Sequence, residues 1–392
     1  ELQALALTAG ARVAASIVGK RDGYHPATIL GGGKIEELRR LVDSTGADLV
    51  VFDNELTAGQ QDRLESELGT KVLGRTALIL DIFAQRARTG EGKAQIELAQ
   101  LAYLLPRIRG KGPELSRLGG GIGTRGPGET KLEVDRRRIR RRMRKLERDL
   151  SHMESVRATQ RKRRVRTGTA SICLVGYTNS GKSSTMNRLT GSSAYVEDRL
   201  FSTLDSFTRR LRLPSGQQAV ISDTVGFIRK LPHELVAAFH STLEVVREAD
   251  LLLHIADATS EDTLGDRINA VEEVLCELGA SQIPRVMVFN KCDLLRPVES
   301  ERLENRYPGS LQVSALTGEG IETLLEVIDG RLSESATVRL ALPAGKGDLL
   351  SRAYRDGVVH AREYVGETVI LTVTMTKEAC KKYEGYLLQV ER

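Results

Sequence analysis

Cysteine is scarce in this sequence, with four residues in 392, and no two of them form a C-x-x-C pair. They lie far apart, mostly in apolar stretches, which predicts reduced core thiols in a cytoplasmic protein. The six histidines show no metal-ligand spacing, and no apolar run approaches the roughly 18 residues that span a bilayer. These absences argue against a disulfide-stapled protein, a histidine-based metal centre and a membrane span. The cysteines are Cys173, Cys276, Cys292 and Cys380.

The chain is too long for one ordinary hydrophobic core, so we expect several domains, and we expect a monomer. The sequence begins at Glu1 rather than at a methionine. We therefore expect a short native N-terminal segment, including any targeting peptide, to precede it.

Positive charge is concentrated in one part of the chain. The net charge is only +6, but residues 107–166 contain 21 basic and 7 acidic residues, so the remainder is net acidic. Mixed-sign charge runs are usually solvated helix faces. The run RRRIRRRMRK instead carries eight positive charges in ten residues, and its self-repulsion favours contact with a polyanion. Of the two candidates, nucleic acid and an anionic membrane surface, we favour nucleic acid.

The first half of the chain predicts a small parallel α/β domain in residues 1–88, with strand candidates such as RVAASIV (12–18). Residues 89–167 predict a helix, a glycine-rich loop and a second, long helix. In that second helix, apolar residues recur at spacings of three and four from Ile139 to Val156, as in a coiled-coil seam. Together they predict an antiparallel basic helical hairpin.

The second half predicts a larger α/β domain in residues 168–332, in which apolar strand candidates alternate with helical segments. Residues 333–392 predict a small α+β domain, with TKEACKKYEGYLL (376–388) as its last helix. The expected fold class is therefore α/β: a phosphate-loop nucleotide-binding domain preceded by the α/β domain and hairpin and followed by the α+β domain.

A phosphate-binding loop follows an apolar strand and opens a helix. Its glycines allow backbone N–H groups to close around phosphates, Lys182 supplies a positive charge to the β and γ groups, and the Ser183 hydroxyl coordinates Mg²⁺. Taken alone, the motif is also compatible with a simple glycine-rich turn. The loop is Gly176, Tyr177, Thr178, Asn179, Ser180, Gly181, Lys182 and Ser183.

Three further motifs follow at the ends of predicted strands. In the first, Asp223 is placed to hold magnesium through water and the Gly226 amide to reach the γ-phosphate. In the second, Asp293 accepts hydrogen bonds from guanine donors that adenine lacks, and in the third a backbone amide faces the guanine oxygen. Together the motifs predict binding of GTP and GDP. They are Asp223, Thr224, Val225 and Gly226; Asn290, Lys291, Cys292 and Asp293; and Ser314, Ala315 and Leu316.

A hydroxyl from the segment between the phosphate loop and Asp223 is expected to complete the magnesium shell. Thr203 is the first choice, but spacing alone leaves Ser202, Ser206 and Thr208 as competitors. The segment contributes Phe201, Ser202, Thr203, Leu204 and Asp205. We take Lys182, Thr203, Asp223 and Gly226 as the catalytic set.

Phe227 follows Gly226, where many GTPases carry a glutamine that orients water. A phenyl ring can neither donate a hydrogen bond to the attacking water nor accept one from it, so we expect slow hydrolysis that a partner stimulates. We also expect Phe227 to pack this loop onto the domain. We interpret His233 and His240 as surface or interface histidines. Gly31, Gly32, Gly33 and Lys34 are interpreted as a turn into a helix rather than a phosphate site.

The chain resembles the HflX family of ribosome-associated GTPases over nearly its whole length. The resemblance rests on GYTNSGKS, LFSTLD, DTVGFIRKLPHELVAAFHSTLEVVREADLLLH, NKCD, PATILGGGK and GPGETKLEVDRRRI. It favours Thr203 as the magnesium ligand. It also implies that the basic hairpin reaches the rRNA of the large ribosomal subunit and that the protein separates stalled or idle ribosomes into subunits.

Two other functions remain open at this point: a ribosome-assembly GTPase acting on precursor subunits, and an RNA-binding scaffold with little turnover. Asn179, two residues before Gly181, further suggests K⁺ as a second cation, because some GTPases that carry a hydrophobic residue in place of the glutamine use such an asparagine.

Overall fold

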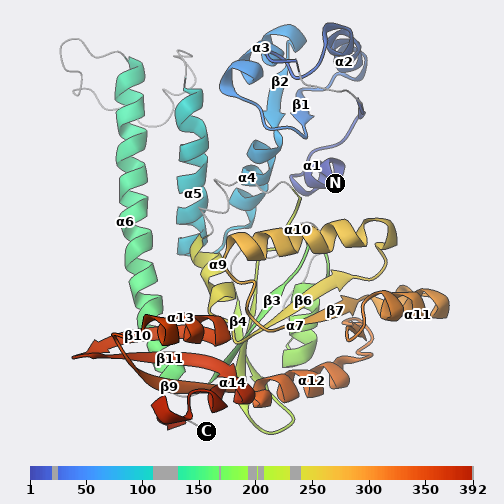
Figure 1. Cartoon of the computed structure of the whole chain (residues 1–392). Helices are drawn as coiled ribbons and strands as arrows, with labels where there is room; N and C mark the ends of the chain where they lie inside the picture. Colours follow the sequence, from blue (N-terminus) through green and yellow to red (C-terminus); the bar gives the residue numbers. More distant parts are fainter. Residues whose placement is uncertain are drawn as a thin grey trace. The chain divides into compact units, whose positions relative to one another are not determined.

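The computed structural model describes residues 1–19, 25–108, 131–166, 169–192, 201, 207–229 and 240–390 (Figure 1). The described residues form two compact units, one up to His152 and one from Met153 onward. Within these residues, no helix combines the length and apolar character needed to cross a membrane. The division into four domains stays a prediction.

The first unit begins with a small parallel pair of strands covered by helices. Strands β1 and β2 pair in parallel, and Phe52, Leu64 and Val72 belong to the core between them and the helices. The predicted strand at residues 12–18 is wrong: these residues have no regular structure, and none of them is buried, so no core contact holds them against the β1–β2 pair. The elements are α1 (Leu2–Thr8), α2 (Gly32–Thr45), β1 (Leu49–Phe52), α3 (Ala58–Leu68), β2 (Lys71–Gly74) and α4 (Arg75–Arg86).

The predicted hairpin helices are α5 (Gly90–Leu104), followed by the 3₁₀ turn Leu105–Arg107, and α6 (Lys131–Arg166). They run antiparallel, since Arg142 of α6 forms two 2.6 Å hydrogen bonds with Glu97, while Arg136, nearer the start of α6, donates to the carbonyl of Ile108. The seam holds at Leu146, which is 3% exposed, but not at Val156, which is 47% exposed. The glycine-rich loop lies outside the described residues.

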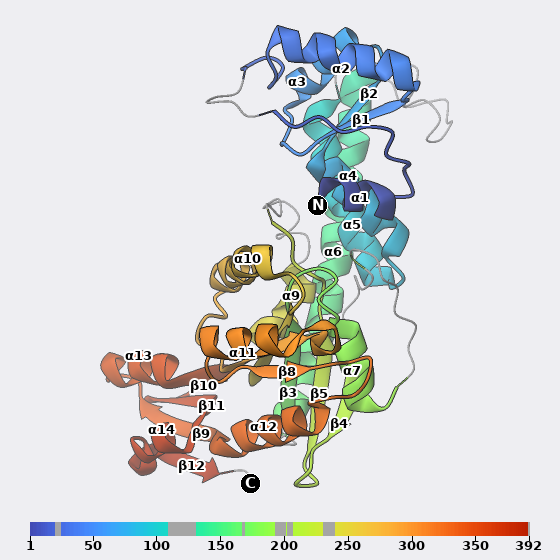
Figure 2. The ribbon, with the colours of Figure 1, turned by 90° about the vertical axis from the view of Figure 1, so that its right-hand side faces the viewer.

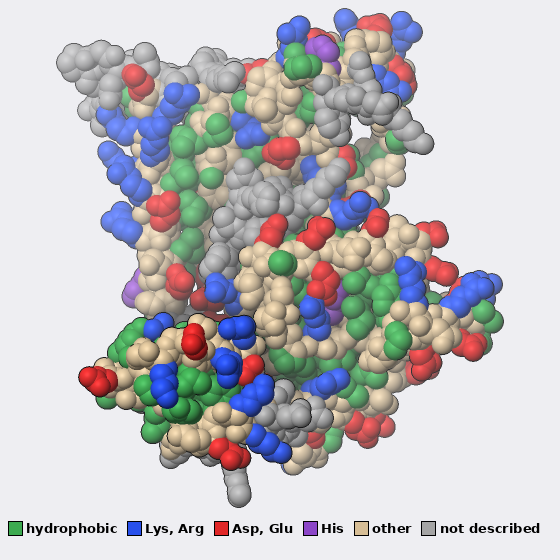
Figure 3. Space-filling view, in the orientation of Figure 1, with side chains coloured by type: hydrophobic (Ala, Val, Ile, Leu, Met, Phe, Trp, Pro, Cys, Tyr) green, Lys and Arg blue, Asp and Glu red, His purple; other side chains and the backbone are tan. Residues whose placement is uncertain are grey.

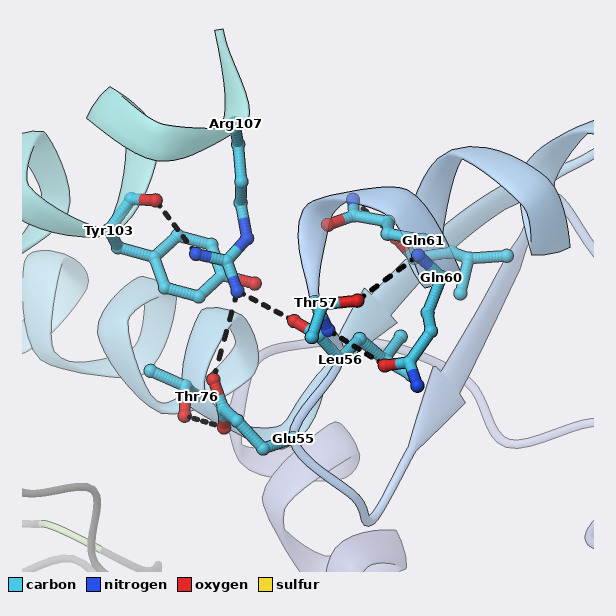
Figure 4. A network of polar contacts seen from close by, with 9 residues as sticks. Glu55, Leu56, Thr57, Gln60, Gln61, Thr76, Tyr103 and Arg107 are labelled. Carbon is cyan, nitrogen blue, oxygen red and sulfur yellow. Dashed lines mark hydrogen bonds and ion pairs between the residues drawn. The ribbon is translucent and has the colours of Figure 1, made fainter. Parts of the chain in front are cut away.

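A polar network fixes the end of this first hairpin helix to the α/β part (Figure 4). The Arg107 guanidinium lies 3.4 Å above the Tyr103 ring and donates to the carbonyl oxygens of Tyr103 and Leu56. Glu55 lies 3.8 Å from Arg107 and accepts from Thr76. Burial raises the pKa of Tyr103, although Arg107 opposes this. Arg107, which lies shortly before the glycine-rich segment, is therefore held by several contacts.

The second unit contains a six-stranded sheet of order β4-β5-β3-β6-β7-β8, parallel except for the antiparallel pair β4 and β5. Helices α7 and α12 cover one face, and α10 and α11 the other (Figures 1 and 2). The edge strand β4 was not predicted, because its sequence TRRLR is mostly polar. The elements are β3 (Ala170–Val175), α7 (Lys182–Thr190), β4 (Thr208–Arg212), β5 (Gln218–Asp223), α9 (His240–Arg247), β6 (Leu251–Asp257), α10 (Leu264–Glu277), β7 (Arg285–Asn290), α11 (Pro297–Arg306), β8 (Leu311–Val313) and α12 (Ile321–Glu334).

The C-terminal part is an antiparallel sheet of order β10-β11-β9-β12 that buries one face under α13 and α14. His360 joins it to the part that contains the six-stranded sheet, lying 3.3 Å from Asp250. The helix predicted at 376–388 is only partly right: α14 is short, and the apolar end pairs with β9 as a strand. The elements are β9 (Ser335–Pro343), α13 (Gly347–Asp356), β10 (Gly357–Val365), β11 (Thr368–Thr376), α14 (Lys377–Lys381) and β12 (Leu387–Val390).

All four cysteines are free. Cys173 is buried in β3, where desolvation raises its pKa, so it is the core thiol that the sequence predicts. Cys276 is exposed on α10, so the prediction of a core thiol is wrong there.

Candidate functional site

The predicted motifs meet at the carboxyl edge of the six-stranded sheet. The phosphate loop follows β3, Asp223 ends β5, Asn290 ends β7, and Ser314 comes directly after β8. Parallel strands bring their carboxyl ends to one edge, where ligands of open α/β sheets bind. Four segments that are far apart in the sequence therefore form one site.

The phosphate loop closes around Lys182, which is buried and donates to the carbonyl oxygens of Gly176 and Tyr177 at 3.1 and 2.9 Å. Burial lowers the pKa of Lys182 to about 8, and the nearby carboxylate of Asp223 limits the shift. The fold thus holds this ammonium in surroundings that disfavour its charge. A bound phosphate would supply the opposite charge.

Ser183 and Asp223 lie together at the start of α7. The Ser183 hydroxyl donates to the Asp223 carboxylate at 2.6 Å, and Asp223 is 2% exposed. A hydroxyl and a carboxylate are the hard oxygen ligands that Mg²⁺ prefers, directly or through water. The chemistry of this pair therefore fits the predicted cation.

Gly226, in the loop after β5, is tightly packed against the phosphate loop. A Cβ atom on Gly226 would lie 2.8 Å from Thr178 Cα, 2.9 Å from Thr178 Cγ2 and 3.0 Å from Lys182 Nζ. No larger residue fits without moving the phosphate loop. The Phe227 amide donates to Gly176 O at 3.1 Å, and the Phe227 carbonyl accepts from Thr178 N at 2.8 Å. The Phe227 ring is 1% exposed. Phe227 therefore packs this loop onto the domain.

Asn290 connects the phosphate loop to the loops after β7 and β8, which contain the predicted guanine-binding motifs. Its side-chain amide donates to Ser180 O at 3.0 Å and its side-chain oxygen accepts from Ala315 N at 3.0 Å. Gly181, at φ 88°, is needed beside it, because a Cβ there would lie 2.0 Å from Asn290 Nδ2. These contacts bring the third and fourth motifs against the first.

Two further contacts, which the sequence did not predict, hold the loops that contain the predicted guanine-binding motifs. Lys291 donates to Asp257 at 2.7 Å, and hydrogen bonds from Lys291 and Thr259 outweigh burial, so that the pKa of Asp257 is below its ordinary value. Arg188 donates to Thr317 O at 2.7 Å, beside the loop that contains Leu316. An acid at the end of a parallel strand was a usable signal for Asp257, whereas nothing local marked Arg188.

The structure describes only some of the remaining predicted residues. Thr208 is no longer an attractive magnesium ligand, because its hydroxyl bonds to Ser222 at 2.9 Å within the β4–β5 pair. Phe201 is buried. Ser202, Thr203, Leu204, Asp205, Ser206 and His233 lie outside the described residues, and the side chain of His240 is not described.

Family models match almost the entire chain. Their descriptions are GTP-binding GTPase N-terminal for residues 1–84, GTP-binding GTPase middle region for 86–164, 50S ribosome-binding GTPase for 171–291 and HflX C-terminal domain for 300–392.

Curated relatives are similar over nearly the same length. GTPase HflX of Caldanaerobacter subterraneus subsp. tengcongensis is 48% identical over 389 residues, which covers 99% of this chain and 90% of the relative. GTPase HflX of Escherichia coli is 44% identical and covers 91% of this chain and 84% of the relative. A GTP-binding protein of Sulfolobus solfataricus, solved with GDP, is 26% identical, covers 85% of this chain and 94% of that chain, and has a TM-score of 0.43.

Asp293→Asn is expected to weaken GTP binding by about 2–4 kcal/mol, because charge-assisted hydrogen bonds to guanine are lost. Calorimetric titration with GDP and xanthosine diphosphate measures the change. Xanthine carries a carbonyl oxygen in place of the guanine amine, so the asparagine amide should donate to it and xanthosine diphosphate affinity should rise. Unchanged GDP affinity would mean that Asp293 does not face the base.

Nucleotide affinity is expected to fall above about pH 8, the pKa of Lys182 in the free protein. A neutral Lys182 must take up a proton to pair with phosphate, so affinity should decrease toward tenfold per pH unit. GDP titrations at pH 7, 8 and 9, each in two buffers of different ionisation enthalpy, measure both affinity and proton uptake. Equal affinities at pH 7 and 9 with no proton uptake would contradict this assignment.

Proposed function

This chain belongs to the HflX family of GTPases, and we propose that it binds the large ribosomal subunit through its basic hairpin and splits stalled or idle ribosomes into subunits. The observation that carries the proposal is the pairing, in one chain, of the nucleotide-binding motifs at the edge of the six-stranded sheet with a concentrated row of arginines on α6. Figure 3 shows Lys and Arg side chains along this helix. Phosphate backbones of rRNA are the polyanion that such a row fits.

Not all of these arginines are equally available to RNA. Arg142 is paired with Glu97, and Arg136 donates to the carbonyl of Ile108. Arg137, Arg138, Arg140 and Arg141 are exposed, and Arg138 lies 4.0 Å from Asp135 on the same helix. These four side chains are therefore our first choice for the rRNA contact.

Magnesium fits the site as the cation of GTP hydrolysis, with Ser183 and Thr203 as its protein ligands and Asp223 holding it through water. When bound, it would neutralise negative charge on the phosphate oxygens. Lys182 would hold the β and γ groups, and the Gly226 amide would sense the γ-phosphate. We propose that GTP orders Thr203 and Gly226 into the ribosome-binding form and that hydrolysis releases it.

Hydrolysis by the free protein is proposed to be slow. Phe227 is buried and offers no polar group to the attacking water. A ribosomal partner would then supply the missing positioning and stimulate turnover. The scaffold function is disfavoured, because Lys182, Ser183 and Asp223 are all present and lie in the site.

The splitting function is tested by sedimentation of intact ribosomes with this protein and either a non-hydrolysable GTP analogue or GDP. Free subunits should appear with the analogue and not with GDP. Intact ribosomes combined with binding to precursor subunits would instead support the ribosome-assembly function.

In the same assay, Arg→Gln at 137, 138, 140 and 141 should reduce large-subunit binding by orders of magnitude at moderate salt and flatten its salt dependence, because counterion release is lost. Glutamine keeps helix propensity, and GDP affinity should not change. A charge-matched control carries Arg→Gln at the exposed positions 302, 306, 352 and 355. If the two variants bind equally well, the α6 arginines are only a solvated surface.

Potassium is proposed as an additional cation at Asn179, whose side chain is exposed and whose backbone has φ 60°. Hydrolysis should be faster in K⁺ than in Na⁺ buffer. Asn179→Gly keeps access to the left-handed backbone while removing the amide, so it should abolish this difference. Equal parental rates in the two salts, with and without ribosomes, would count against a potassium site.

A further inference from the structure

Arg188 reaches from the helix that begins at the phosphate loop to the loop that follows β8. Lys182 and Ser183 lie in the first turn of α7, and Arg188 lies in its last turn, about 9 Å further along at the usual rise per residue. A cation in the last turn of a helix is ordinary. The Arg188 side chain does more than complete its own helix, because its Nη2 donates to Thr317 O at 2.7 Å.

This contact depends on a glycine. A Cβ on Gly318 would lie 2.9 Å from both Cζ and Nε of Arg188, and closer still to Nη2. The φ angle of Gly318 is 96°, which side chains other than glycine rarely allow. The guanidinium therefore lies directly against the backbone of this loop, and one of its N–H groups points at the preceding carbonyl.

The loop is also held on its other side. The Asn290 side chain accepts from Ala315 N at 3.0 Å, and Ser314 Oγ accepts from Thr317 N at 3.1 Å. Leu316 lies between Ala315 and Thr317, and its amide has no acceptor within the part of the chain that the structure describes. Because both neighbours of Leu316 are held, the loop presents this amide in a defined position. It is available to the guanine oxygen that the loop is predicted to meet.

We propose that Arg188 is a positioning residue for guanine recognition: by holding Thr317, it keeps the loop amide where it meets the oxygen at position 6 of the base. The guanidinium is engaged by Thr317 and Gly318, so it acts through the loop and not on the nucleotide. Adenine carries an amine at position 6, which cannot accept from the amide, so the loop position bears on the choice of base. This inference rests on the proposed nucleotide site and deepens it.

Arg188→Met tests this role, because methionine keeps much of the aliphatic length and removes the donor and the charge. Arg302→Met is the matched control, since it removes the same groups from an exposed arginine of α11. Each protein is titrated with GDP and with 6-thioguanosine diphosphate, in which sulfur, a weak acceptor, replaces only the oxygen at position 6. Arg188 is exposed and its hydrogen bond competes with water, so Arg188→Met should weaken GDP binding by about threefold to tenfold.

The ratio of the two affinities distinguishes positioning from a general loss of structure. The parental protein and Arg302→Met should prefer GDP over the sulfur analogue, and Arg188→Met should lose most of this preference, because its amide no longer meets the oxygen. The ratio of GDP to inosine diphosphate affinity reports the base amine predicted to face Asp293, and it should stay parental in both variants.

Parental GDP affinity in Arg188→Met, or a loss of affinity that leaves the preference over the sulfur analogue unchanged, would overturn the inference. A parental protein that binds GDP, inosine diphosphate and the sulfur analogue equally well would contradict the proposed guanine site and this inference with it. The parental ratios therefore distinguish the two failures.

Discussion

Two backbone hydrogen bonds between Phe227 and the phosphate loop are the contacts on which the rest of the nucleotide site depends. They join Gly176 O and Thr178 N to the residue after Gly226, at 3.1 and 2.8 Å. This pairing leaves no room for a side chain at Gly226, since a Cβ there would overlap Thr178. The loop proposed to sense the γ-phosphate is therefore attached directly to the predicted phosphate-binding loop. A movement of one changes the other without an intermediate element.

The base side is attached by a second, independent contact. The Asn290 side chain donates to Ser180 O and accepts from Ala315 N, so it alone connects the loops that follow β3, β7 and β8. An amide suits this position because it donates and accepts at once. A carboxylate of the same size would face the Ser180 carbonyl with no donor. The Asn290 side chain thus serves the shape of the site, while Asp293 remains the residue proposed to recognise guanine.

The sequence predicted the motifs and most elements well because both depend on local patterns. Strand β3 and the loop after it, for example, are specified by an apolar run followed by spaced glycines. Predictions failed where a distant partner decides the outcome. Residues 12–18 have the composition of a strand but pair with none, whereas the polar β4 is a strand because β5 pairs with it. The segment Leu387–Val390 was interpreted as helix, yet it completes the C-terminal sheet beside β9.

The same limit applies to charge. The sequence counts every arginine of α6 toward a basic surface, but Arg142 and Arg136 make contacts within the hairpin. Side-chain partners thus reduce the charge that the surface presents, and no local pattern reveals which arginines they engage. In the nucleotide site, burial and not pairing is what disfavours a positive charge. Burial lowers the pKa of Lys182 even though Gly176 O and Tyr177 O accept its hydrogen bonds and Asp223 lies nearby. A buried cation whose charged form the fold disfavours costs stability, which is expected at a functional site and not in an ordinary core.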